Sequence, residues 1–160
     1  MTVTIRPARP GDEATILGFI RDLAEYEKLS HMVEATAGGL AAALFAAAPR
    51  VFCDIAELDG APAGFALWFY NFSTFLGRNG LYLEDLYVRP EARRRGVGEA
   101  LLSGLAARCK AENLGRLEWS VLDWNTPAID FYKSIGAVAM DEWTVFRVTG
   151  DALDRLAERR

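Results

Sequence analysis

The sequence predicts one α/β domain that spans residues 1–160, with helices packed on a mixed central sheet. The length of 160 residues is that of a single domain, and a chain of this size buries one sizeable core. Short segments of period-two apolar residues alternate along the chain with longer segments of helical periodicity. No internal repeat and no linker separates these segments, so we expect them to share one core.

The first part of the chain predicts one strand and two helices. An apolar alternation that stops at Pro7 predicts the strand. Apolar residues then recur every three or four positions over residues 12–28, which predicts an amphipathic helix. An alanine- and leucine-rich segment predicts a second helix over residues 34–48, although two glycines inside it cost on the order of 1 kcal/mol each.

The middle of the chain predicts three strands. Residues 51–58 and 64–72 flank an Asp59-Gly60 turn and read as an antiparallel hairpin. Residues 71–80 have the turn composition of a loop, but they include Phe72 and Phe75. We expect aromatic side chains on a loop to cover another surface. A further long strand is expected over residues 81–88.

The last part predicts a helix over residues 97–113, a strand over 117–121 and a helix over 126–136. A last strand is expected over residues 143–148, followed by a short polar helix from Asp151.

Charge and composition exclude several classes of function. The 18 basic and 22 acidic residues give a net charge of −4, which disfavours a nucleic-acid binder. Cys53 and Cys109 are far apart and lack CxxC or His partners, so we expect no metal site and a reducing compartment. No signal-like or membrane-spanning apolar run is present, and we expect a cytoplasmic protein without membrane partners.

The segment of residues 81–99 carries the clearest chemical signal. A strand leads into the arginine-rich sequence RRRGVG of residues 93–98, which opens the next helix. Free backbone N–H groups, the helix dipole and guanidinium groups meet there, and this combination binds phosphate. Leu101 stands where a dinucleotide fingerprint has its third glycine, and no GK[ST] follows as in a P-loop. Taken alone, the cluster fits a solvated helix start equally well.

Two motifs together resemble the GNAT superfamily of acyl-CoA-dependent N-acyltransferases. Residues 93–98 match its R/Q-x-x-G-x-G/A pyrophosphate loop, and residues 125–136 match its N-x-x-A/S-x-x-F-Y-x-x-x-G helix. The resemblance spans nearly the whole chain and implies the GNAT fold, with about seven strands and four main helices. It also implies acetyl-CoA as cosubstrate, direct acetyl transfer to an amine without a metal, and a homodimer. Residues 24–27, 72–78 and 82–85 resemble the spermidine/spermine (diamine) acetyltransferase branch.

The resemblance assigns roles to individual residues. Glu84 matches the acid that removes a proton from the amine, acting directly or through water, and Tyr132 matches the tyrosine that protonates the CoA thiolate. Strand alternation sends Asp85 to the opposite face from Glu84, where a structural role is at least as plausible. The residues implied to contact CoA are Leu86, Tyr87 and Val88 along the pantetheine arm, Arg93, Arg94, Arg95, Gly96, Val97, Gly98 and Glu99 at the pyrophosphate, and Asn125 and Tyr132.

The acceptor is expected to be a small polyamine or diamine held by Glu27 and Glu84. The chain departs from the diamine branch at residues 73–75, where that branch carries an acid and this sequence has none. This departure gives weight to an acceptor with its own carboxylate, of the thialysine type, which Arg78 would bind. A protein N-terminus, an antibiotic, or a non-catalytic acyl-CoA sensor remain alternatives.

Overall fold

The computed structural model describes residues 1–160, which divide into two compact units, Met1–Ser120 and Val121–Arg160. The first unit contains a five-stranded sheet in the order β1-β2-β3-β4-β5. Its strands are β1 (Val3–Pro7), β2 (Phe52–Leu58), β3 (Ala61–Ser73), β4 (Arg78–Val88) and β5 (Leu117–Glu118). The first four strands pair antiparallel and β5 pairs parallel to β4, so the mixed sheet that the sequence predicts is confirmed.

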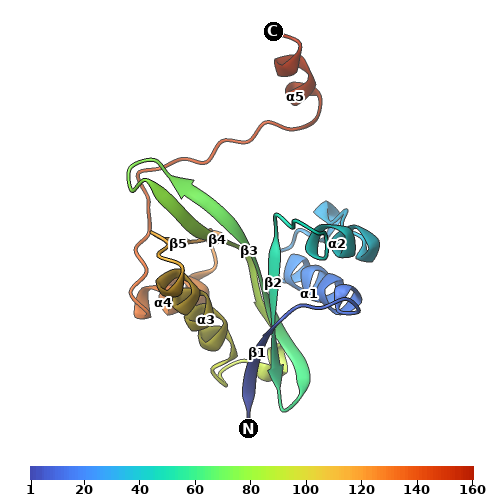
Figure 1. Ribbon diagram of the computed structural model, residues 1–160, viewed down its shortest axis with the longest axis vertical. Helices are drawn as coiled ribbons and strands as arrows, with labels where there is room; N and C mark the ends of the chain where they lie inside the picture. Colours follow the sequence, from blue (N-terminus) through green and yellow to red (C-terminus); the bar gives the residue numbers. More distant parts are fainter. The chain divides into compact units, whose positions relative to one another are not determined.

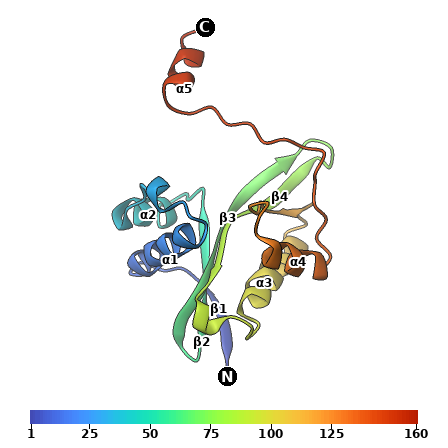
Figure 2. The same cartoon turned by 180° about the vertical axis from the view of Figure 1, so that it is seen from behind.

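Helices cover both faces of this sheet. The helices of the first unit are α1 (Glu13–Tyr26), α2 (Ala37–Leu44) and α3 (Val97–Ala111), with the short 3₁₀ turns η1 (Ser30–Met32) and η2 (Pro90–Ala92). The second unit contains α4 (Thr126–Ser134) and α5 (Gly150–Ala157). α1 and α2 lie on one face of the sheet and α3 lies on the other (Figures 1 and 2). None of these helices has both the length and the apolar character that crossing a membrane requires.

The core fills the space between α1, α2 and the sheet. It is formed by Ile16, Phe19, Leu44, Cys53, Ile55, Phe65, Leu67 and Tyr87. The Phe19 ring stacks on Phe65 with centroids 5.5 Å apart, and both side chains are almost fully buried. Truncating a phenylalanine in such a position to alanine typically costs about 3–5 kcal/mol. This packing fixes α1 against the centre of the sheet.

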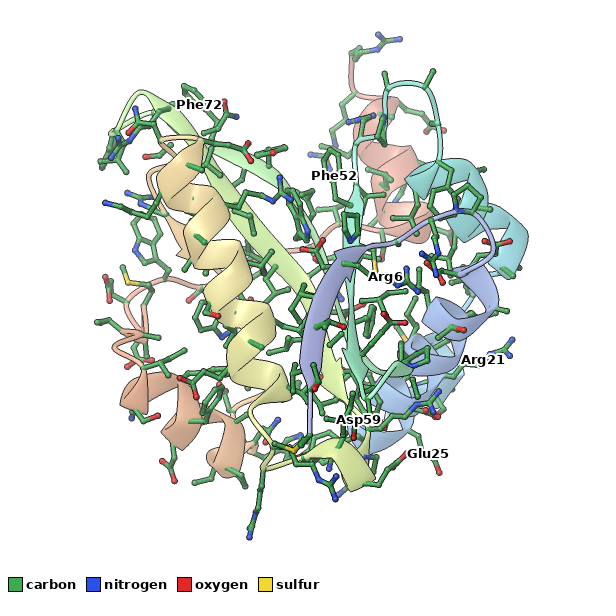
Figure 3. All side chains as sticks on the ribbon, turned by 60° about the horizontal axis from the view of Figure 1, so that its bottom comes forward. Arg6, Arg21, Glu25, Phe52, Asp59 and Phe72 are labelled. Atoms are coloured by element: carbon green, nitrogen blue, oxygen red, sulfur yellow. The ribbon has the colours of Figure 1, made fainter.

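An ion pair between β1 and the start of α1 holds the helix at its other end. Arg6 donates two hydrogen bonds to the Asp12 carboxylate at 2.7 and 3.0 Å, and its Nε lies 3.4 Å from Glu57 (Figure 3). The hydrogen bonds from Arg6 hold the pKa of Asp12 below its ordinary value. Since the residue after Asp12 begins α1, the pair fixes where the helix starts.

The segment of residues 71–80, predicted to be a loop, is the tip of a long hairpin. β3 continues to Ser73 and β4 already begins at Arg78, which leaves only residues 74–77 as a turn. The turn is closed by the Gly77 N–H, which donates to the Ser73 carbonyl at 2.8 Å, and Gly77 has a positive φ of 68°. Phe72, which is labelled in Figure 3, is 59% exposed at this tip, and Phe75 is 91% exposed.

Two other predictions of strands are wrong in extent. Only Leu117–Glu118 of the expected strand over 117–121 pairs in the sheet. The strand expected over 143–148 is not formed, and Trp143, Val145 and Phe146 are 71%, 84% and 90% exposed. A strand needs a neighbouring strand for its backbone hydrogen bonds, which a local apolar pattern does not supply. The sheet therefore has five strands in place of about seven.

The predicted helices are all present, and the count is five α-helices in place of four main ones because the short helix near Asp151 forms as α5. α2 is shorter than the predicted 34–48. It begins after Thr36, whose hydroxyl accepts a hydrogen bond from the Gly39 N–H at 3.0 Å. This is the N-cap that stops the helix from extending further toward the N-terminus.

Candidate active site

The loop before α3 has the backbone geometry of an anion-binding site. Arg94 and Gly96 both adopt positive φ, at 62° and 79°. Gly96 is the N-cap of α3, and no side chain caps the first turn. The first N–H groups of α3 and the positive end of its dipole are therefore available to a phosphate. Glycine at 96 is favoured by its left-handed backbone, whereas a Cβ at Gly98 would only contact Val88 at 3.7 Å.

The side chains of this loop divide into two groups. Arg94, Arg95 and Glu99 are exposed, while Val97 is 1% exposed and anchors the helix start. Arg93 is exposed as well, but its guanidinium turns toward the body of the first unit.

The Arg93 guanidinium lies against two tyrosines. Its central carbon is 5.5 Å from the centroid of the Tyr26 ring and 5.7 Å from that of the Tyr87 ring. Its Nε also donates a hydrogen bond to the Val88 carbonyl at 3.0 Å. The structure thus links the predicted pyrophosphate loop to Tyr26, the last residue of α1.

β4 and β5 part along the segment where the pantetheine arm is predicted to bind. They pair only at Leu81 with Leu117 and at Tyr82 with Glu118. At the point of parting, the Tyr82 hydroxyl and the Ser120 hydroxyl lie 2.9 Å apart. Leu86, Tyr87 and Val88 lie beyond this point, so their backbone on the β5 side is outside the ladder. Such an edge can bind the amides of an extended ligand.

A β-bulge places the two acids of β4. Leu67 pairs with Asp85 and Trp68 pairs with Leu83, so Glu84 is the extra residue between them. Leu67 belongs to the core under α1 and α2, and Asp85 opposite to it lies on that same face. Glu84 is exposed and Asp85 is partly buried. The acid on the α1 side of β4 is therefore Asp85.

Burial and neighbouring acids perturb this carboxyl. Desolvation first, and then the charges of Glu84 and Glu27, raise the pKa of Asp85 to about 6. Desolvation also raises the pKa of Glu27, the C-cap residue of α1. The structure thus brings Glu27, Glu84 and Asp85 within electrostatic reach of one another. A cluster of acids of which two are partly buried favours a cationic ligand.

The sequence leaves a structural role for Asp85 at least as plausible as a catalytic one, and in the structure Asp85 is the acid of the cluster whose pKa is perturbed most. From the sequence, only the regular alternation of a strand indicates which face of the sheet residues 84 and 85 point to, and a bulge is not visible in that pattern. Tyr87 could have pointed to Asp85, because Tyr87 is a core residue two positions further on and residues two apart in a strand share a face.

Arg78 lies apart from the acid cluster. It begins β4, six residues before Glu84, which corresponds to about 20 Å along the strand. Its guanidinium donates a hydrogen bond to the Asn113 side-chain oxygen at 2.8 Å, in the turn after α3. The structure therefore does not bring Arg78 together with Glu27 and Asp85.

Two of the predicted site residues belong to the second unit. Asn125 is buried and is the N-cap residue of α4, which carries proline in its first turn. Tyr132 lies in the last turn of α4, with its ring 5.8 Å from that of Phe131. The helix of the predicted N-x-x-A/S-x-x-F-Y motif is thus formed.

A cavity of about 150 Å³ lies elsewhere in the first unit and is lined in part by Phe52. Phe52, which is labelled in Figure 3, begins β2. None of the predicted site residues lines the cavity. Its polar groups satisfy one another, because Trp68 donates to Asp54 at 3.2 Å, Arg108 lies 4.8 Å over the Trp68 ring, and Arg108 donates to Glu112 at 3.0 Å. We therefore do not include it in the candidate site. No group of three or more acidic, Cys or His side chains is placed to hold a metal ion.

Comparison with known proteins places this geometry in a family. The sequence model of the Acetyltransferase (GNAT) family matches residues 16–137. Thialysine N-epsilon-acetyltransferase of Bos taurus is 40% identical to the chain, over 97% of each. The L-ornithine N5-acetyltransferase of Arabidopsis thaliana is 32% identical, over 95% of this chain and 86% of its own.

Solved structures agree with the sequence matches. An integron cassette protein from the mobile metagenome of V. cholerae superposes with a TM-score of 0.81 at 29% identity, covering 99% of each chain. An aminoglycoside acetyltransferase from a soil metagenomic sample, at 17% identity, shares the fold with a TM-score of 0.77. The chain therefore has the GNAT fold, belongs to the GNAT acetyltransferase family, and is an acetyl-CoA-dependent N-acetyltransferase that acts on an amine.

Proposed function

We propose that the acceptor is the side-chain amine of a small basic amino acid of the thialysine type. The observation that carries this proposal is the group of relatives that span nearly the whole chain. Thialysine N-epsilon-acetyltransferases of three mammals are 38–40% identical, and an L-ornithine acetyltransferase is 32% identical. A spermidine/spermine acetyltransferase-like human protein is 30% identical over 93% of the chain. These relatives favour the amino-acid acceptor over the polyamine that the sequence motifs alone suggest.

Glu27 and Asp85 form the proposed site for the acceptor ammonium. Both are partly buried, and their mutual repulsion is part of what raises the pKa of Asp85. An ammonium placed near them would relieve that repulsion, because an opposite charge favours the ionised carboxylates. Arg78, which is bonded to Asn113, is outside this proposed site.

The acids also serve the chemistry. An alkylammonium with a pKa of about 10.4 must lose a proton before its nitrogen can attack. We assign this proton to the pair of Glu84 and Asp85, with Asp85 on the acceptor side and Glu84 exposed to solvent. Acetyl-CoA supplies the acetyl group as a thioester. As the C–N bond forms and the C–S bond breaks, the leaving sulfur takes a proton, for which Tyr132 is the proposed donor.

The proposed CoA site consists of the loop and the strand edge. The backbone of residues 94–98 at the start of α3 would hold the pyrophosphate, with Arg94 and Arg95 as cations beside it. The edge of β4 at Leu86, Tyr87 and Val88 would pair with the pantetheine amides, as its separation from β5 permits.

An amine panel tests the acceptor. Purified protein and acetyl-CoA are incubated with thialysine, L-ornithine, L-lysine, spermidine or putrescine, and release of the CoA thiol is followed. We expect the highest kcat/KM for thialysine or L-ornithine. A higher kcat/KM for spermidine would overturn the proposal in favour of a polyamine acceptor, and CoA binding without thiol release from any amine would indicate a sensor.

A matched pair of variants on α1 tests the ammonium site. Glu27→Gln should raise KM for the amine about fivefold or more, because it removes one of two carboxylates facing the cation. Glu25→Gln removes the same charge from an exposed position two residues away and should leave KM nearly unchanged. Equal effects of the two substitutions would show that only the net charge of the helix matters.

We also propose that the enzyme is a homodimer. The support lies in the second unit, where Trp143, Val145 and Phe146 expose most of their surface, and Leu153 and Leu156 of α5 are each 51% exposed. Several large apolar side chains exposed in one unit are costly in water unless a partner covers them. Sedimentation equilibrium of the full chain tests this, and a monomer at all concentrations would refute it.

A further inference from the structure

One side chain of the pyrophosphate loop reaches the end of the helix that carries Glu27. The Arg93 guanidinium lies 5.5 Å from the Tyr26 ring and 5.7 Å from the Tyr87 ring, within the range of cation–π attraction. Tyr26 is the last residue of α1, and Glu27 follows it as the C-cap. Arg93 thus contacts the residue adjacent to the proposed acceptor-binding acid.

The two tyrosines differ in how firmly they are held. Tyr87 is 7% exposed, belongs to the core and lies 6.1 Å from the Phe19 ring. Tyr26 is 41% exposed at the end of a helix, where last turns commonly fray. Tyr87 is therefore fixed by the core, whereas Tyr26 is the more exposed of the two tyrosines that Arg93 contacts.

Arg93 is distinct from its neighbours in this respect. Arg94 and Arg95 carry the same charge in the same loop and are exposed like Arg93, but neither makes such a ring contact. The Nε of Arg93 also donates to the Val88 carbonyl at 3.0 Å, which ties the side chain to the end of β4. The loop, the strand edge and the end of α1 therefore meet at this one guanidinium.

We propose that Arg93 is a positioning residue that couples the binding of CoA to the binding of the amine. The inference rests on the proposed function, in which the loop binds the pyrophosphate and Glu27 binds the ammonium. Once the pyrophosphate orders the loop, Arg93 is fixed between the tyrosines and holds Glu27 in place. By linkage, the amine then binds more tightly to the CoA complex than to the free enzyme, and CoA binds more tightly in the presence of the amine by the same factor.

Hydrogen exchange tests the structural step without any acceptor. Amide exchange of residues 23–28 is compared with and without saturating CoA in the wild-type protein, Arg93→Met and Tyr26→Leu. CoA should slow exchange of this segment in the wild type and should not do so in either variant, each measured at a CoA concentration that saturates it in a separate titration. Arg21→Met removes a cation from an exposed position of α1 and should keep the CoA-dependent protection (Figure 3). Protection that is absent in the wild type, or that persists in both variants, overturns the proposal.

Calorimetric titration of thialysine into the free protein and into the CoA complex tests the coupling itself. We expect affinity to be about fivefold higher in the complex, since two weak cation–π contacts support the coupling. Arg93→Met and Tyr26→Leu should each abolish this factor, the double variant should do no more, and Tyr26→Phe, which retains the ring, should preserve it. Losses that add in the double variant refute the link. If the wild type binds CoA and shows the protection but acetylates no amine, the proposed function fails and the link from the loop to α1 stands.

Discussion

Replacing Asp85 by asparagine should separate the chemical role of this carboxylate from its structural cost. In the wild type, burial and the charges of Glu84 and Glu27 raise the pKa of Asp85 to about 6. The rate constant kcat/KM should therefore fall as pH is lowered through about 6, because the carboxylate becomes protonated. Asp85→Asn should reduce kcat/KM at neutral pH about 100-fold or more and remove this acid limb. Glu84→Gln should retain the limb but move it to lower pH, since a charge that raises the pKa of Asp85 is gone.

Asp85→Asn should lower activity but raise the stability of the folded protein. The folded pKa of about 6 lies above the ordinary value of 3.8, so the folded state binds the proton more tightly and the wild type loses stability as pH rises from about 4 to about 6. The difference corresponds to at most about 3 kcal/mol. Asparagine carries no such cost, and its advantage in Tm over the wild type should therefore grow between pH 4 and pH 7 by several degrees, up to roughly 10 °C.

Steady-state pH profiles and differential scanning calorimetry on the two variants measure both effects. An Asp85→Asn enzyme that keeps its activity and its acid limb would refute the assignment of the acid. A Tm difference that is constant from pH 4 to pH 7 would refute the account of its burial.

Three further predictions concern other parts of the molecule. Tyr132→Phe should lower kcat about tenfold or more with CoA affinity unchanged, and an undiminished kcat at every pH would remove this residue as the acid. Gly96→Ala should cost about 1 kcal/mol of stability, measured by thermal unfolding, because φ of 79° is strained for alanine; an unchanged Tm would contradict this. Phe146→Glu should convert the proposed dimer to a monomer in sedimentation equilibrium, because it places a charge at a side chain that is 90% exposed in the single chain and would be buried in the dimer; a variant that remains dimeric would exclude this segment from the interface.

Locally encoded parts of the fold could be predicted from the sequence. α1 and α3 follow their apolar periodicity, and the turn at Asp59 and Gly60 joins β2 to β3 as expected. The hairpin tip and the segment 143–148 were assigned wrongly because strand extent depends on hydrogen bonds to a neighbouring strand. The length of a strand is thus decided by its partner, which a single segment of sequence does not show.

The candidate site divides in the same way. The sequence pointed to the loop of residues 93–98 because its glycine, charge and position are local features. The sequence does not indicate that the Arg93 side chain contacts Tyr26, because the two residues are far apart in the sequence: Tyr26 precedes β2 and Arg93 follows β4. The choice between Glu84 and Asp85 depended on the bulge, a property of the pairing of β3 with β4.

The bulge at Glu84 gives β4 one residue more than the part of β3 with which it pairs. Leu83 pairs with Trp68 and Asp85 pairs with Leu67, so the strand presents an apolar side chain to one helical layer and an acid to the other across a single extra position. Deleting residue 84 would make Leu83 and Asp85 adjacent, and adjacent residues of a strand point to opposite faces, so both halves of β4 would keep their pairing with β3 and only the bulge would disappear. Relatives of this chain could therefore gain or lose the second acid of the pair through one inserted or deleted codon, while Asp85 stays beneath α1.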